Sequence, residues 1–234
     1  MYGGELMDYI YNDDLSFSKY LSKCFMWMFI GLLISFGTGA IFNYTGLFVT
    51  LFSSFGTMFT LVLAIVEIIL VISVSRSVFK LNLKKAIGMF IAYSFINGIT
   101  LASIFFIYDL NSIFYCLLAT SGVFGFMALI GYTTKLDLSK LGTFISVALI
   151  GLLISGIILM FAYNETIYAW YSILGIGIFM LITAYDIHII KRMYYNANTI
   201  EGKNALAIYG ALQLYLDFIN IFIRLVSLFA RSRD

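Results

Sequence analysis

Long apolar runs alternate with short polar connections along almost the whole chain. Seven runs stand out, and each is close to the ~20 residues that a helix needs to cross a lipid bilayer. They cover residues 25–42, 57–75, 86–107, 113–132, 143–163, 170–190 and 205–230. Strands of a membrane barrel would be about half as long and would alternate in polarity. The pattern predicts an all-α, polytopic membrane protein whose seven transmembrane helices form one domain, residues 25–230, between a short cytoplasmic tail (1–24) and a C-terminal tail (231–234).

The composition points to lipid as the solvent of this fold. Hydrophobic residues make up 62% of the 234 residues and charged residues 11%, against roughly 25% charged in soluble domains. A water-soluble protein of this length could not bury so much apolar surface. The net charge of +2 is too small to indicate a nucleic-acid partner. The acidic first 19 residues have no basic stretch or cleavage site, so they do not resemble a signal peptide.

The basic residues predict the orientation of the chain in the membrane. Those at the N-terminal tail and at the second, fourth and sixth connections are Lys19, Lys23, Arg76, Lys80, Lys84, Lys85, Lys135, Lys140, Lys191, Arg192 and Lys203, and the other three connections contain none. Because cytoplasmic connections are enriched in Lys and Arg, we expect a plasma-membrane protein with a cytoplasmic N-terminus. Seven full crossings would place Arg231 and Arg233 outside, whereas a re-entrant last segment would return them inside. The 26-residue length of that segment favours a full crossing.

A polar stripe runs along the last apolar segment. At about 100° per residue, Gln213, Asp217, Asn220 and Arg224 fall on one face of the helix. Polar side chains in hydrocarbon are costly, so this face must contact other helices or water. We therefore expect the seventh helix to lie centrally in the bundle. Asp217 and Arg224 are too far apart for an easy salt bridge within the helix, and the stripe could also be a purely structural hydrogen-bond network.

Asp186 near the end of the sixth apolar segment allows two interpretations. It could extend to the membrane surface and pair with Lys191 or Arg192, or it could meet Asp217 between the last two helices. Two carboxylates close together in a low dielectric cannot both ionise, so such a pair shares a proton and responds to pH. Once deprotonated, Asp186, Asp217 and nearby amide oxygens would form the hard-oxygen environment that Ca²⁺ prefers.

Three further ionisable residues, Glu67, Arg76 and His188, lie in or beside the apolar segments. Glu67, midway along the second segment, either pairs with an arginine or stays protonated, and a structural role is equally compatible with its position. Arg76 could reach inward to a carboxylate or act as a cytoplasmic anchor. His188, the only histidine, points to a different side of its helix from Asp186 and cannot form a transition-metal site alone. We assign no role to it.

Several stretches resemble the motifs of one known family in order and spacing. They are residues 97–101 (NGITL), 126–139 (FMALIGYTTKLDLS), 183–186 (TAYD) and 211–220 (ALQLYLDFIN), the last being the most specific. On these motifs the chain resembles the Bax inhibitor-1 family (transmembrane Bax inhibitor motif proteins), and specifically a bacterial member. It departs from the family at His188, where Gln or Asn is common, and at Ser103, where proline is frequent.

The resemblance implies a seven-helix fold with a central seventh helix and a pH-controlled calcium leak. By motif, Asp186 and Asp217 are the pH sensor, and Arg76 matches an arginine that holds the sixth-helix aspartate in a closed state. We expect a calcium leak channel with Glu67, Gln213, Asn220 and Arg224 along the ion pathway, Ca²⁺ and protons as partners and no bound cofactor. A Ca²⁺/H⁺ antiporter would use the same residues, and a regulator that binds other membrane proteins, such as a protease or cell-death factors, remains an alternative.

No enzyme motif is present. The chain has no H-E-x-x-H, no nucleophile elbow and no phosphate-binding loop. Intramembrane aspartyl proteases also use two membrane aspartates, but their second aspartate lies in a Gly-x-Gly-Asp sequence, whereas Asp217 follows Leu214-Tyr215-Leu216. We therefore expect a transport protein rather than an enzyme.

Overall fold

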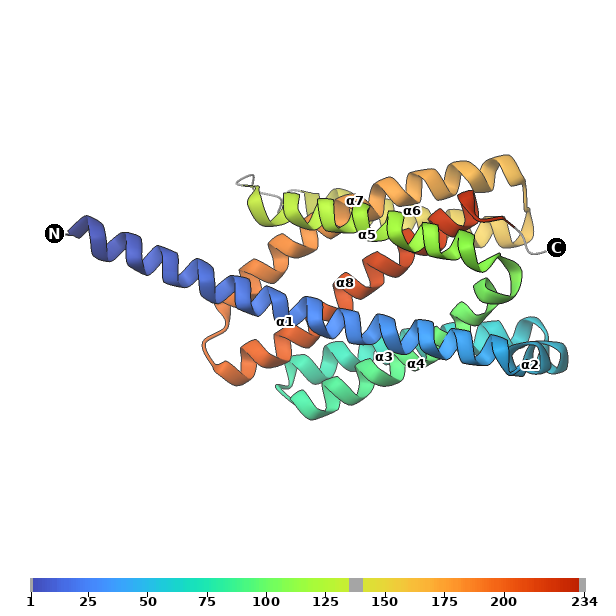
Figure 1. Cartoon of the computed structure of the whole chain (residues 1–234), viewed down its shortest axis with the longest axis horizontal. Helices are drawn as coiled ribbons and strands as arrows, with labels where there is room; N and C mark the ends of the chain where they lie inside the picture. The colour runs from blue at the N-terminus through green and yellow to red at the C-terminus, as the bar shows by residue number, and fades with distance from the viewer. Residues whose placement is uncertain (1, 135–140, 232–234) are drawn as a thin grey trace.

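A computed structural model describes residues 2–134 and 141–231, which form eight α-helices (Figure 1). The helices are α1 (Tyr2–Tyr44), α2 (Leu47–Phe55), α3 (Thr57–Phe79), α4 (Leu83–Ile107), α5 (Leu110–Thr133), α6 (Leu141–Phe161), α7 (Glu165–Asn196) and α8 (Ile200–Phe229). All except α2 contain a stretch long and apolar enough to cross a membrane, which in α1 is Ser16–Tyr44. The seven predicted spans are therefore confirmed. Lys135, Asp137, Lys140 and Arg233, which entered the predictions above, lie outside the described residues.

Helix α1 extends through the segment that was predicted as a tail, residues 1–24. Helix α1 already begins at Tyr2, and both Phe17 and Cys24 are buried. The Phe17 ring stacks on Tyr132 of α5 with 5.8 Å between ring centroids and lies 5.6 Å from the ring of Tyr194 on α7. These aromatic contacts make it favourable for the helix to continue beyond the apolar run that sequence periodicity detects.

The short helix α2 was not predicted. It occupies the first connection, between two glycines with positive φ, Gly46 at 71° and Gly56 at 57°. Glycine adopts a positive φ without steric cost, so these two residues allow the chain to turn sharply at both ends of α2.

Side-chain caps fix where helices α5 and α7 begin. Asp109 Oδ2 accepts hydrogen bonds from the amides of Asn111 and Ser112 at the start of α5. Asn164 caps α7 through the amide of Ile167 in the same way. Such caps satisfy backbone donors that lack partners within the helix, so the polar residues between the apolar runs fix where the helices begin.

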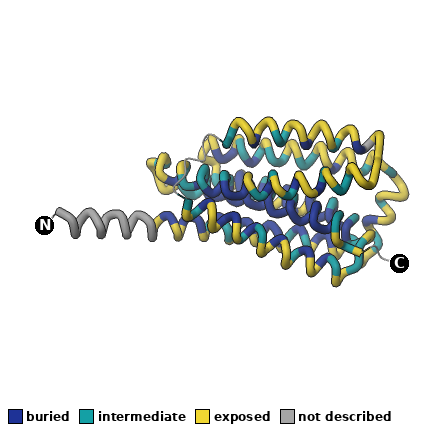
Figure 2. Tube along the Cα trace, turned by 90° about the horizontal axis from the view of Figure 1, so that it is seen from above, coloured by how far each residue is buried: buried dark blue, intermediate teal, exposed yellow. Residues whose placement is uncertain are grey.

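Helix α8 is the most buried of the seven spans. In its most apolar stretch 67% of residues are buried, compared with 11% in α3 and in α6, and Figure 2 shows a continuous buried core through the bundle. It packs against α1, α3, α4, α5 and α7, whereas α6 packs against α7. This burial agrees with the sequence of α8, because a helix with a polar stripe must turn that stripe away from lipid. A complete ring of helices around α8 stays a prediction, because α6 faces α8 across cavities described below.

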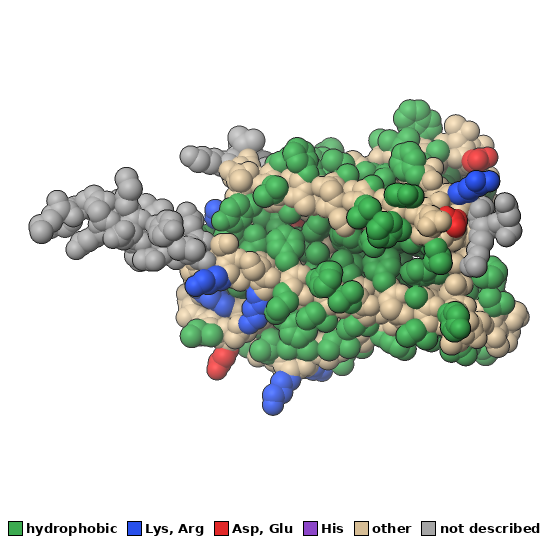
Figure 3. Space-filling model, viewed as in Figure 1, with side chains coloured by type: hydrophobic (Ala, Val, Ile, Leu, Met, Phe, Trp, Pro, Cys, Tyr) green, Lys and Arg blue, Asp and Glu red, His purple; other side chains and the backbone are tan. Residues whose placement is uncertain are grey.

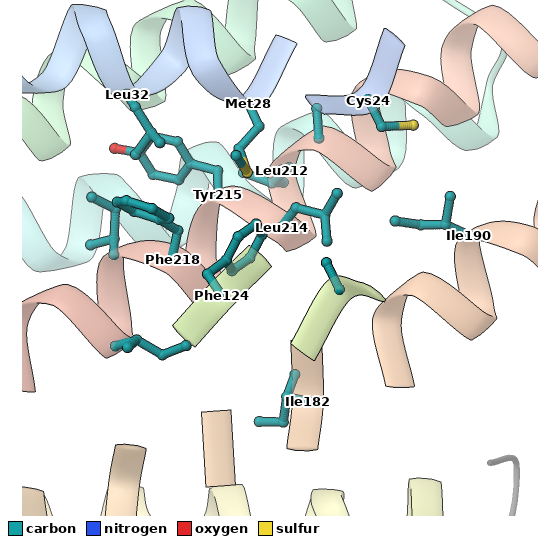
Figure 4. Close-up of a cluster of buried hydrophobic side chains, with 14 of the residues drawn as sticks. Cys24, Met28, Leu32, Phe124, Ile182, Ile190, Leu212, Leu214, Tyr215 and Phe218 are labelled. Carbon is teal, nitrogen blue, oxygen red and sulfur yellow. The ribbon is translucent and has the colours of Figure 1, made fainter. Parts of the chain in front are cut away.

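Large side chains of α8 fill the space between the helices around it. Leu212 and Tyr215 are almost fully buried, and Figure 4 shows them together with Met28 and Leu32 of α1 and Phe124 of α5. Tyr215 also carries a hydroxyl, which becomes important below because a buried hydroxyl needs hydrogen-bond partners.

On the face shown in Figure 3, the charged side chains gather near the two ends of the bundle. The two chain termini lie at opposite ends of the bundle, and α8 runs between those ends as one continuous helix of 30 residues (Figure 1). This path favours a full crossing by the last helix over a re-entrant segment. The cytoplasmic location of the N-terminus stays a prediction from the basic residues.

Candidate functional site

Asp186 of α7 and Asp217 of α8 line the same cavity, which we call the acidic cavity. Its volume is about 420 Å³, and both aspartates are buried, with 6% and 3% of their surface exposed. Helices α3 and α6 complete the walls, with Ser75 and Val71 on α3. The described lining residues are Val71, Ser75, Ile145, Leu149, Phe179, Ile182, Tyr185, Asp186, Tyr209, Leu212, Gln213, Leu216, Asp217 and Asn220. The structure therefore brings the two predicted carboxyl groups to one site.

No basic side chain neutralises this pair among the described lining residues. Of the bases expected as alternative partners for Asp186, Lys191 instead lies over the rings of Phe17 and Tyr132, with its Nζ 5.5 and 6.0 Å from their centroids. Asp186 is therefore not a carboxylate that extends to the membrane surface to meet Lys191.

Polar atoms around Asp217 come from both helices. The Thr183 side chain of α7 lies beside the Asp217 carboxyl group, and its hydroxyl donates to the Phe179 carbonyl oxygen at 2.8 Å. Oδ2 of Asp217 and Oε1 of Gln213 are buried without a partner. Unpaired buried oxygens are costly in a finished core, so these atoms are the ones available to a proton, water or cation.

The acidic cavity offers few strong ligands for a metal ion. Among the side chains that the structure describes, within residues 16–134 and 141–231, no group of three or more His, Cys, Asp or Glu is placed to hold a metal. A tight Ca²⁺ site needs about six to eight oxygens. Asp186 and Asp217 are therefore too few to form a tight Ca²⁺ site by themselves.

Arg224 lies at the other end of the polar stripe and lines a second cavity, which we call the arginine cavity. Its volume is about 330 Å³, and Asn220 lines both cavities. The guanidinium lies over the Tyr171 ring, 4.5 Å from its centroid, and donates to the Tyr171 carbonyl and hydroxyl oxygens at 3.5 and 3.3 Å. A Cβ on Gly175 would overlap the guanidinium, so glycine makes room for it. The partner of Arg224 is thus a tyrosine of α7 rather than an acid.

Glu67 faces α4 instead of the acidic cavity. Its Oε1 accepts hydrogen bonds from Thr100 at 2.7 Å and from Asn97 at 3.4 Å. Asn97 in turn accepts from the Tyr215 hydroxyl at 2.8 Å, and that hydroxyl lies 2.6 Å from Ser35 Oγ. This buried network joins α1, α3, α4 and α8. This network was not predicted from the sequence, although Asn97 and Thr100 lie three residues apart on one helix face, a spacing that signals a shared partner.

Arg76 and His188 take no part in the acidic cavity. Arg76 is exposed near the end of α3, and no ion pair joins it to Asp186 among the described residues. The predicted closed-state contact is therefore not formed in this structure. His188 is half-buried and is not among the cavity's described lining residues, in agreement with its predicted direction away from Asp186.

Comparison with known proteins gives a consistent family. The family described as inhibitor of apoptosis-promoting Bax1 matches residues 17–234. The chain is 34% identical over 229 residues to the inner membrane protein YbhL of Escherichia coli, covering 97% of each chain. It is 35% identical to an uncharacterized protein of Borreliella burgdorferi, covering 93% of this chain and 94% of the relative. An uncharacterized membrane protein of Streptococcus pyogenes is 37% identical over 72% of this chain and 73% of its own length. Similarity of this extent, together with the seven-span fold, establishes the chain as a multi-pass membrane protein of the Bax inhibitor-1 family.

Proposed function

We propose that this protein is a pH-sensitive calcium leak channel gated by protonation of the Asp186 and Asp217 pair. One observation carries the proposal: two buried carboxyl groups on adjacent helices share a cavity whose described lining includes no basic side chain. The proposal places the N-terminus in the cytoplasm of the cell, on the side where most of the Lys and Arg residues lie.

The closed state is the one in which the pair holds a proton. Two unit charges in a low dielectric repel strongly, so the pair is stable as one acid and one carboxylate, or as two acids. Asp217 Oδ2 is buried without a hydrogen-bond partner. An ionised carboxylate that is buried and unpaired costs far more than a neutral carboxyl group, and this supports a protonated Asp217 in the state described here.

Loss of the proton would open the site. Two negative charges without a basic partner attract a divalent cation and water into the acidic cavity. Helices α3 and α6 are the walls best able to yield, because only 11% of the most apolar stretch of each is buried. A high external or cytoplasmic pH therefore favours flux, and a low pH suppresses it.

Two routes lead from the cavity toward the far side of the membrane. Along α8 the next charged residue after Asp217 is Arg224, whose positive charge repels Ca²⁺. Along α3, Glu67 lies one helical turn beyond Val71, a residue that lines the acidic cavity, and its carboxyl group accepts hydrogen bonds from α4. We infer that Ca²⁺ passes between α3 and α8 beside Glu67, and that Arg224 lies outside the pathway.

The test is Ca²⁺ flux from liposomes containing the purified protein, measured across pH. Wild type should conduct more at high pH, and both Asp186→Asn and Asp217→Asn should abolish this pH dependence, since an amide cannot titrate. Glu165→Gln is the matched control, because it removes an exposed carboxylate at the start of α7. An Asp217→Asn variant with the pH profile of wild type would refute the gate.

The same vesicles separate the alternative functions. A Ca²⁺/H⁺ antiporter would move Ca²⁺ against its own gradient when a proton gradient is imposed, which a leak channel cannot do. A protein that acts only by binding other membrane proteins would give no flux at any pH.

A further inference from the structure

The guanidinium of Arg224 lacks a counter-charge. Arg224 is 9% exposed, its Nε is buried without a hydrogen-bond partner, and no ion pair to it is formed by the described residues. Its two hydrogen bonds to Tyr171, at 3.5 and 3.3 Å, are long for a charged donor. A buried charge of this kind is costly unless an anion compensates it.

The arginine cavity supplies further groups that suit an oxyanion. Three tyrosines, Tyr163, Tyr168 and Tyr171, and the amide side chain of Asn220 line it with Arg224. Each tyrosine hydroxyl and the amide NH₂ can donate a hydrogen bond. Arginine itself binds phosphate oxygens through its planar fork of N–H groups. A phosphate group in this cavity would neutralise the guanidinium and meet several donors.

An apolar groove continues from the arginine cavity. It has a volume of about 540 Å³ and lies between α6 and α7, and it shares Leu159 and Tyr171 with the arginine cavity. Its α6 wall extends from Ala148 to Ala162, about 20 Å at the helical rise per residue. That length exceeds half of a hydrocarbon core of about 30 Å, so the groove can hold an acyl chain of one leaflet.

We propose that an anionic phospholipid binds here, with its headgroup phosphate at Arg224 and one acyl chain in the groove between α6 and α7. Arg224 lies five residues before the end of α8 at Phe229, about 8 Å along the helix axis, so its side chain can reach the level of lipid headgroups. No acidic residue is found among the described lining residues of either cavity. The described lining therefore offers a zwitterionic lipid no carboxylate for its ammonium, and the positive charge of Arg224 repels that group, which favours phosphatidylglycerol over phosphatidylcholine.

The test measures lipid retained by purified, delipidated protein in native mass spectrometry. Phosphatidylglycerol should bind roughly tenfold or more tightly than phosphatidylcholine with the same acyl chains. Arg224→Gln should remove this preference, Arg224→Lys should retain part of it, and Arg231→Gln should leave it unchanged, because Arg231 is exposed near the same end of α8. Equal retention of phosphatidylglycerol by Arg224→Gln and wild type would overturn the proposal.

A second variant tests the acyl chain and does not depend on a buried residue. Gly151 lines the groove, and a Cβ there would meet nothing within 4 Å. Gly151→Phe should therefore fold normally, fill the groove and weaken retention of both lipids several-fold. Unchanged retention would refute the acyl-chain position. Inorganic phosphate alone is the remaining arm, compared with phosphatidylglycerol by the rise in Tm that each gives to wild type. If phosphate raises the Tm as much as phosphatidylglycerol does, and Arg224→Gln removes both effects, the site takes a free oxyanion and the lipid proposal fails.

Discussion

Replacing Gly131 with alanine should force α5 and α7 apart beside the acidic cavity. A Cβ at this position would lie 2.5 Å from the Ala184 carbonyl oxygen, 2.9 Å from Ala184 Cα and 2.9 Å from Ile187 Cβ. Preferred separations between carbon atoms are about 3.5–4.0 Å. Two of the three clashing atoms are backbone, so a side-chain rotation cannot relieve the overlap, and the helices must shift.

The magnitude follows from two opposing terms. Overpacking in a close-packed core costs about 1–3 kcal/mol, while alanine is favoured over glycine within a helix by roughly 0.5–1 kcal/mol. Gly122→Ala isolates the second term, because Gly122 is on the same helix, is exposed, and would place its Cβ where nothing lies within 4 Å. The difference in unfolding free energy between the two variants should therefore be about 1–3 kcal/mol, with Gly131→Ala the less stable.

Thermal unfolding in one detergent, followed by tryptophan fluorescence, measures this difference. For a chain of this size each kcal/mol corresponds to roughly 2–4 °C in Tm. Because Ala184 and Ile187 lie on either side of Asp186 in sequence, a shift of α7 should also move the pH midpoint of Ca²⁺ flux in Gly131→Ala but not in Gly122→Ala. If Gly131→Ala has a Tm equal to or above that of Gly122→Ala, the α5–α7 contact at Gly131 is not close enough to exclude a Cβ.

Three further substitutions test other contacts. Tyr215→Phe removes the hydroxyl at the centre of the buried network and should cost about 1–3 kcal/mol in thermal unfolding, whereas Tyr44→Phe, at a residue 93% exposed, should cost almost nothing. Glu67→Gln can still accept the hydrogen bond from Thr100, so it should fold normally but lower Ca²⁺ flux several-fold at high pH without moving the midpoint. Arg76→Gln should raise flux at low pH if the family's arginine contact forms in a closed state, and unchanged flux would reject that contact for this chain.

The spans and the polar stripe could be predicted from sequence because the bilayer imposes them. Lipid requires about 20 apolar residues for each crossing and penalises every ionisable side chain that faces it. Asp186 and Asp217 are therefore visible as exceptions in apolar runs, and the stripe on α8 follows from helical periodicity. Their position in one cavity required the family resemblance or the structure, because periodicity does not fix how one helix is rotated against the next.

The missed features depend on contacts between helices. Glu67 pairs with Asn97 and Thr100, and Arg224 with Tyr171, because of the way α3 packs on α4 and α7 on α8. The apolar and polar positions along α3 and α8 do not reveal which residue of a neighbouring helix pairs with Glu67 or with Arg224. The early start of α1 has the same origin, since Phe17 is buried by aromatic residues more than 100 positions away in the chain.

The polar stripe of α8 carries two acids in one half and an arginine in the other, and Asn220 lies between the acidic cavity and the arginine cavity. Under the two proposals, this division gives separate tasks to the two least buried helices. The proposed cation path from Asp186 and Asp217 would meet repulsion toward Arg224 and would turn toward α3. The proposed anionic headgroup would be attracted at Arg224 and repelled at the aspartates, so it would stay between α6 and α7. Filling the groove with Gly151→Phe should then reduce lipid retention while Ca²⁺ flux keeps its pH dependence, and joint loss of both would mean that the two halves act as one site.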